Sequence, residues 1–252
     1  MTAVHRTLSC HLVLLAAVLA VGLTVGLAGP ALAQQVTLDM GEGGSLATRS
    51  VQLMVLVTIL SIVPGLAVMV TCFPFIVTVL SILRQGLGLQ QAPPNMLIVS
   101  LAMFLTWFVM DPVLTAAWQQ GVEPFTRDQI DLATAFARTS EPFRGFMANR
   151  IDPDTFATMD ALRPRDSPGI RDAPLSLLVP SFMLSELQRA FEIGFLIFLP
   201  FLIIDLVVSA ILMSMGMMMV PPAVVSLPFK LAFFVVADGW SLIAGALVRS
   251  YM

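Results

Sequence analysis

Long apolar segments and one polar region make up most of this chain. The apolar segments are Val51–Leu83, Met96–Ala117, Ile193–Val220 and Ala223–Val248. Each has the roughly 20 residues that a helix needs to cross a bilayer. Prolines or charges interrupt all four, at Pro64, Pro74, Asp111, Pro112, Asp205, Pro228, Lys230 and Asp238. Because such breaks at membrane depth are tolerated only under a cover of protein or in a wet cavity, we predict broken hydrophobic helices in one subunit of a larger assembly.

The polar region, residues 119–174, contains 16 of the 29 charged residues. Short helices fit its pattern. Thr126 and Gln129 have the spacing of a capping box, and Asp152-Pro153 is typical of a helix start. The region should end in an extended connector, because four prolines follow at short intervals. These prolines are Pro164, Pro168, Pro174 and Pro180.

Residues 181–195 have the pattern of an amphipathic helix. Its apolar face is formed by Leu184, Leu187, Phe191 and Phe195. Glu186, Arg189 and Glu192 fall on the opposite face, spaced to pair along the helix surface. This charged row is either a solvated face or a seam against a neighbouring subunit.

The first 33 residues resemble a secretory signal peptide, with Arg6, an apolar run from Leu12 to Leu27, and Ala31-Leu32-Ala33. The run is long for such a peptide, so an uncleaved first membrane helix is the alternative. Cleavage after Ala33 would remove both histidines and one of the two cysteines, and would leave Cys72. A mature chain of this kind lacks the residues of a zinc cluster or a Ser-His-Asp triad. We expect no enzymatic activity, no metal and no cofactor.

Composition indicates a membrane protein, because 58% of the residues are hydrophobic and 12% are charged. The net charge of −3 and the absence of a basic stripe argue against nucleic acid as a partner. A removed signal peptide would place the polar region in the periplasm and the turn after Asp205 in the cytoplasm. We expect an all-α, oligomeric fold in five parts. These are the signal peptide (1–33), a short periplasmic segment (34–50), a first hydrophobic hairpin (51–118), the polar periplasmic region (119–176), and an amphipathic helix with a second hydrophobic hairpin (177–252).

Five of the seven residues from Met213 to Met219 are methionine, and Val220-Pro221-Pro222 follows them. Methionine is unbranched and polarisable, so such a cluster makes a soft surface that can adapt to a changing partner. It can also simply fill gaps between two hydrophobic helices. Counting along the antiparallel hairpin places Asp205 and Lys230 at similar heights, so we expect them to pair, within or between subunits.

Several motifs follow one another along the chain, namely Leu83–Asn95 (LRQGLGLQQAPPN), Leu101–Pro112, Pro142–Met147, Ser185–Leu187, Ala190–Phe195, Leu199–Val207, Met215–Pro222, Leu227–Leu231 and Asp238–Trp240. Together they resemble the FliP family of flagellar type III export-gate proteins. The resemblance runs from about Val51 to Tyr251. One departure is Phe75, where members of the family usually have arginine, and no role is carried onto it.

The resemblance implies a subunit of the gate through which unfolded flagellar proteins leave the cytoplasm. It implies five copies that assemble with the FliQ and FliR proteins in the basal body, next to its MS ring, at the inner membrane. The family's pore-sealing methionines fall on Met217, Met218 and Met219. The intramembrane charges Asp205, Lys230 and Asp238 are expected to serve pairing or assembly. The alternatives are a homologous subunit of a virulence-type injectisome and, in another class, a transporter of small solutes or ions.

Overall fold

The computed structural model describes residues 46–89, 93–162, 169–217 and 219–252. The predicted signal peptide and most of the segment after it lie outside these residues. The chain divides into two compact units between Leu56 and Val57, a point inside helix α2 (Leu46–Met69). In the first unit, the described residues are the first turns of α2. All other described elements belong to the second unit.

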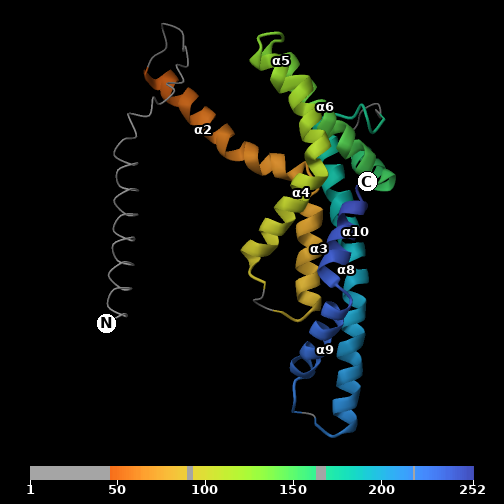
Figure 1. The fold of residues 1–252 in the computed structure, drawn as a ribbon. Coiled ribbons are helices and arrows are strands. Elements are labelled where there is room, and N and C mark those ends of the chain that lie inside the picture. Colours follow the sequence, from red (N-terminus) through yellow and green to blue (C-terminus); the bar gives the residue numbers. More distant parts are fainter. Residues whose placement is uncertain (1–45, 90–92, 163–168, 218) are drawn as a thin grey trace, which may run out of the picture. The chain divides into compact units, whose positions relative to one another are not determined.

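The second unit contains helices of very different length (Figure 1). They are α3 (Phe73–Gly86), α4 (Asn95–Ala117), the π-helical turn η1 (Trp118–Val122), α5 (Glu123–Thr126), α6 (Leu132–Arg150), α7 (Pro153–Ala161), α8 (Leu175–Ser214), α9 (Pro222–Val236) and α10 (Gly239–Arg249). The described part of the chain has no β-strand. The predicted all-α class is therefore confirmed.

Two helical stretches are long and apolar enough to cross a membrane, namely Asn95–Thr126 and Leu175–Ser214. Two bent pairs of helices also reach this length. They are Leu53–Met69 with Phe73–Gly86, bent by 66°, and Pro222–Val236 with Gly239–Arg249, bent by 62°. By length and composition, the described helices supply two to four crossings.

Most of the prolines predicted to interrupt helices lie inside continuous helices. Pro64 lies inside α2, Pro112 inside α4 and Pro228 inside α9. Pro180, predicted in an extended connector, lies inside α8, which begins directly after Pro174. Each of these helices continues because one lost backbone donor, or two in α8 with Pro180 and Pro200, does not end a helix whose other hydrogen bonds are kept.

The breaks fall at residues 70–72, just before the predicted Pro74, and at residues 237–238, which include the predicted Asp238. Pro74 stands in the first turn of α3, where its missing N–H removes no helical hydrogen bond. Asp238 adopts a left-handed backbone with φ 47° between α9 and α10. Both bends are therefore made by short non-helical links, and the first of them leads into a helix start that favours proline.

The polar region forms helices, but one of its predicted caps is wrong. Thr126 is the last residue of α5, and its hydroxyl donates to the Glu123 carbonyl at 2.8 Å. Asp131, not Thr126, precedes α6. The other predicted start is confirmed, because the Asp152 carboxylate accepts a hydrogen bond of 2.8 Å from the Thr155 N–H at the start of α7.

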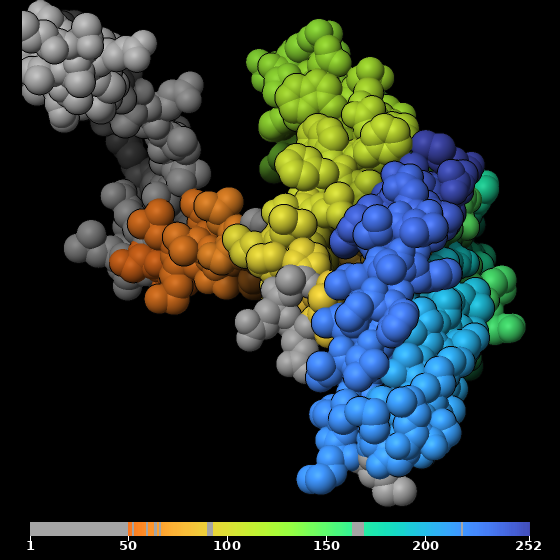
Figure 2. Space-filling view, turned by 60° about the horizontal axis from the view of Figure 1, so that its bottom comes forward, coloured from red at the N-terminus to blue at the C-terminus, as the bar shows by residue number. Residues whose placement is uncertain are grey.

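Helix α8 is the element on which the second unit is built. α3 packs along it and against α4, while α6, α7 and α9 pack on other parts of α8. Figure 2 shows α9 and α10, in blue, beside the light-blue part of α8. Two buried clusters result. One surrounds α3 and includes Phe75, Ile76, Val79 and Leu83; the other joins α6, α7 and the start of α8, and includes Met147, Phe156, Leu178 and Phe182.

Candidate functional site

The methionine turn, residues 213–219, connects α8 to α9. Helix α8 ends in a Schellman motif, in which the Gly216 N–H donates to the Met213 carbonyl at 3.1 Å and the Met217 N–H donates to the Leu212 carbonyl at 3.0 Å. Gly216 has φ +73°, a conformation that side chains rarely adopt. The sequence therefore fixes where the long helix stops and the turn begins.

The described methionines of this turn are exposed. Met219 is 97% exposed and Met217 is 42% exposed, and Met213 and Met215 are also exposed. Met218 lies outside the described residues. Within this chain, Met217 and Met219 do not belong to either buried cluster. Their side chains are available to a partner.

An ion pair joins the two legs of the hairpin. The Lys230 ammonium lies 2.6 Å from the Asp205 carboxylate, whose other oxygen accepts a hydrogen bond of 2.6 Å from the Ser226 hydroxyl. Lys230 also donates to the Gly86 carbonyl at 3.0 Å, at the end of α3. A cation at this end is favourable because the last carbonyls of a helix carry partial negative charge. The structure thus brings Asp205 and Lys230 together and adds a third helix to the contact.

The two members of this pair differ in exposure. Lys230 is 5% exposed, whereas the Asp205 side chain is 36% exposed. The partner of a buried charge matters most when its loss leaves that charge without compensation. Asp205 is therefore the group that permits Lys230 to be buried as a cation.

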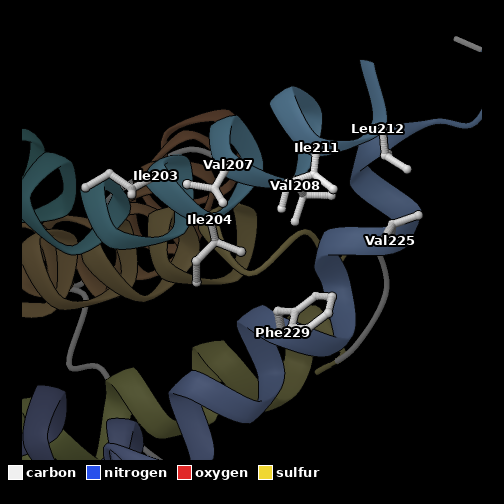
Figure 3. Close-up of a pocket in the computed structure, with 8 residues that line it drawn as sticks. All are labelled: Ile203, Ile204, Val207, Val208, Ile211, Leu212, Val225 and Phe229. Carbon is white, nitrogen blue, oxygen red and sulfur yellow. The ribbon is translucent and has the colours of Figure 1, made fainter. Parts of the chain in front are cut away.

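A groove of about 400 Å³ lies between the same two helices (Figure 3). Its walls come from α8, including Ile204, Val208 and Ile211, and from α9, including Val225 and Phe229. All residues that line it are apolar. The two legs of the hairpin are thus held together by a polar contact beside space that their side chains do not fill.

The third predicted intramembrane charge, Asp238, lies apart from this pair. It is exposed at the bend between α9 and α10, and its side chain makes no capping hydrogen bond to α10. Its backbone carbonyl accepts from the Leu242 N–H at 3.1 Å. Aspartate is among the few non-glycine residues that tolerate a left-handed conformation, which accounts for its presence here.

A second charged group, which we call the Glu186 centre, joins α6, α8 and residues 250–251. Glu186 is fully buried, and its carboxylate lies 2.9 Å from the Arg150 guanidinium and 3.6 Å from that of Arg189. The Tyr251 hydroxyl donates to the same carboxylate. Arg150 also donates to the Ser250 carbonyl at 2.8 Å and covers the Tyr251 ring at 4.1 Å from its centroid.

The Glu186 centre corrects the predicted amphipathic helix. Glu186 and Arg189 do pair along the helix, but Glu186 points into the chain. The residues of the predicted apolar face, Leu184, Leu187, Phe191 and Phe195, are all exposed. Small side chains such as Ser181, Ser185 and Ala190 share the buried side with Glu186 and allow close packing. The usual orientation of an amphipathic helix is therefore inverted within this chain.

Tyr251 is a member of this centre that the sequence did not reveal. Its ring stacks on Phe146 at 6.0 Å and meets the edge of Phe75 at 5.5 Å. Burial raises the pKa of the Tyr251 hydroxyl well above its usual range, so the hydroxyl remains a hydrogen-bond donor at neutral pH. Phe75, at the position where arginine is usual in the resembled family, is thus part of an aromatic contact.

The polar turn after α3 is closed by two residues of its own motif. The Arg84 guanidinium donates to the Asn95 side-chain oxygen, which links the end of α3 to the start of α4. Residues 90–92 lie outside the described part. This contact gives the motif a structural role in joining two helices.

The sequence profile of the FliP family matches residues 56–247. The chain belongs to this family. It is 49% identical to the flagellar biosynthetic protein FliP of Caulobacter vibrioides over 217 residues, which cover 86% of this chain and 82% of that protein. It is 48% identical to the FliP protein of Agrobacterium fabrum, over 92% of this chain and 97% of that protein, and 43% identical to that of Bacillus subtilis, over 81% and 93%.

The resemblance seen in the motifs is therefore confirmed. The family match includes Glu186, Asp205, Lys230 and the methionine turn. It ends before Tyr251, so the aromatic part of the Glu186 centre lies beyond the matched range.

Proposed function

We propose that this chain is a subunit of the flagellar type III export gate in the bacterial inner membrane, and that its methionine turn seals the path of unfolded flagellar proteins. The flagellar relatives support this system over an injectisome. The observation that carries the proposal is the exposed methionine turn between two apolar helices. The role is structural, with no chemical step.

The physical basis is the adaptability of the thioether side chain. Methionine has many rotamers and no charge, so it can pack against varied residues without holding any of them strongly. We propose that Met217, Met218 and Met219 from several copies meet around one axis. There they exclude ions and small solutes at rest and yield to an unfolded chain.

The hairpin supplies the support that such a seal requires. The Schellman motif at Gly216 sets the start of the turn, and the Asp205–Lys230 contact joins its two legs. The contact between Lys230 and Gly86 ties this hairpin to α3. The adaptable methionine side chains are thus carried by a turn whose position is set by these contacts.

Assembly of several copies is also part of the proposal. The exposed apolar face of α8, formed by Leu184, Leu187, Phe191 and Phe195, is the surface that we assign to a subunit seam. On the opposite face of the helix, Arg189 and Glu192 stay predicted members of a second seam, whereas Glu186 is committed to contacts inside the chain. FliQ, FliR and further copies of this chain are the proposed partners, and the basal body is the proposed location.

The test is an ion-leak measurement on cells that carry the replacements Met217→Ala, Met218→Ala and Met219→Ala together. Truncated side chains should leave the axis open, so the resting membrane potential should fall while the subunit remains in the membrane. The matched control carries Met213→Ala and Met215→Ala, because both residues are exposed in the same turn. A tight membrane in the triple variant, or an equal leak in the control, would contradict the seal.

A further inference from the structure

The bent pair α9–α10 is held on α8 at two polar points with unfilled space beside each. One point is Lys230, which contacts Asp205 on α8. The other lies just after α10, where Ser250 contacts Arg150 at the end of α6 and Tyr251 contacts Glu186 on α8. Beside the first lies the apolar groove of about 400 Å³.

Beside the second point lies a cavity of about 220 Å³ between α8 and α10. Ile193 and Ile197 line it from α8, and Leu242 and Ala246 line it from α10. The cavity leaves few direct contacts between α8 and α10. The buried side chains of α10, Ile243 and Leu247, belong to the cluster around α3.

The corner between α9 and α10 is, by contrast, closely packed. A side-chain carbon at Gly239 would lie 2.2 Å from the Phe234 ring, and Phe234 meets the edge of Trp240 at 5.4 Å. The 62° bend is thus fixed by contacts on both sides of it. α9 and α10 are therefore joined through a closely packed corner.

We propose that α9–α10 is a latched arm, whose distal end is locked to α8 by Tyr251 and its contacts with Glu186 and Arg150. When the latch is released, α10 separates from α8 across the cavity that already lies between them. The arm remains attached at Lys230. This device does not depend on the sealing role of the methionine turn.

The charge arrangement makes the latch specific. Glu186 has no exposure to solvent, so its carboxylate depends on the donors around it. The Tyr251 hydroxyl is one of these donors, and the Tyr251 ring also lies under the Arg150 guanidinium. One side chain therefore contributes a hydrogen bond, a cation–π contact and two ring contacts to the lock.

The experiment measures amide hydrogen exchange of the full chain in lipid nanodiscs. In Tyr251→Ala, exchange in residues 240–249 should become at least about tenfold faster, because the hydrogen bond and ring contacts that lock α10 are lost. Exchange in α3, residues 73–86, should change much less, because Tyr251 meets that helix only at the Phe75 ring. The control is Met252→Ala, since Met252 is 86% exposed beside the latch.

A second variant guards against misfolding. Tyr251→Phe keeps the ring and removes the hydroxyl, so a smaller acceleration confined to residues 240–249 is expected. Adding Ala246→Leu, which fills the cavity from the α10 side, should restore protection to Tyr251→Ala. Unchanged exchange of α10 in both Tyr251 variants, or equal acceleration of α3, overturns the latch.

Discussion

The two charged groups on α8 solve the problem of burial in opposite ways. In the Glu186 centre the buried member is the anion, and cations and a tyrosine surround it. In the Asp205–Lys230 pair the buried member is the cation, and its anionic partner is about one-third exposed. The loss of stability on removing one partner of an ion pair therefore depends on whether the partner that remains is buried or exposed.

The largest expected effect on stability comes from removing the cation nearest to the buried Glu186 carboxylate. Arg150→Met should lower the free energy of unfolding by about 3–5 kcal/mol, because it leaves a fully buried carboxylate without its nearest cation. The measurement is thermal and denaturant unfolding of the purified chain in detergent. Adding Glu186→Met to this variant should recover much of the loss. A double variant that is less stable than Arg150→Met would show that the charges themselves hold the fold.

The Asp205–Lys230 pair should respond asymmetrically. Asp205→Ala should cost about 3 kcal/mol, because Lys230 stays buried with the Gly86 carbonyl and no counter-charge. Lys230→Met should cost about 1 kcal/mol, since the partly exposed Asp205 can still be hydrated. The same unfolding measurement compares them. Equal costs would contradict the assignment of Lys230 as the buried member.

Exchanging the charges sharpens this comparison. Asp205→Lys combined with Lys230→Asp should restore assembly only in part. A carboxylate at position 230 would face the Gly86 carbonyl, which is also an acceptor. Recovery of subunit in the assembled complex, measured by co-purification, should fall between that of the native chain and that of either single variant. Full recovery would mean that the contact between Lys230 and the Gly86 carbonyl does not contribute to assembly.

The smallest effect is expected outside both centres, at the start of α7. The Thr155 N–H and hydroxyl hold the pKa of the Asp152 carboxyl below its usual range. A lowered pKa means that the cap stabilises α7 at neutral pH, and that this stabilisation is lost as the pH falls through the folded-state pKa. The protection factor of α7, which compares its exchange rate with that of unprotected amides at the same pH, should therefore fall in acid. Asp152→Asn should keep a cap but abolish this pH dependence.

Local signals were the most reliable guide to the fold. The Asp152-Pro153 start was predictable because a capping side chain and a proline act within one helical turn. The approach of Asp205 to Lys230 followed from counting along a hairpin. The interruptions assigned to Pro112 and Pro228 were wrong, because one lost hydrogen bond does not end a long helix that is otherwise favourable.

Long-range contacts were not predictable in the same way. The pattern around Glu186 suggested an outward-facing charged row, since that orientation holds for a helix at the surface of a soluble protein. Here the partners of Glu186 come from Arg150 and Tyr251, which no local spacing connects to α8. Tyr251 has no neighbouring motif. A buried carboxylate of this kind becomes visible only when the chain is folded.

The length of α8 limits how the subunit can meet a lipid bilayer. Its 40 residues extend about 60 Å, roughly twice the ~30 Å hydrocarbon thickness. To fit entirely within that layer, the helix would need to tilt by about 60°, beyond the usual range of 0–40°. Between about one-third and one-half of α8 must therefore stand outside the hydrocarbon. Glu186, Arg189 and Glu192 all lie in the first half of the helix, so we expect that half to be the part outside. Exposed apolar residues there, such as Leu184 and Phe191, would then need protein, not lipid, as their cover.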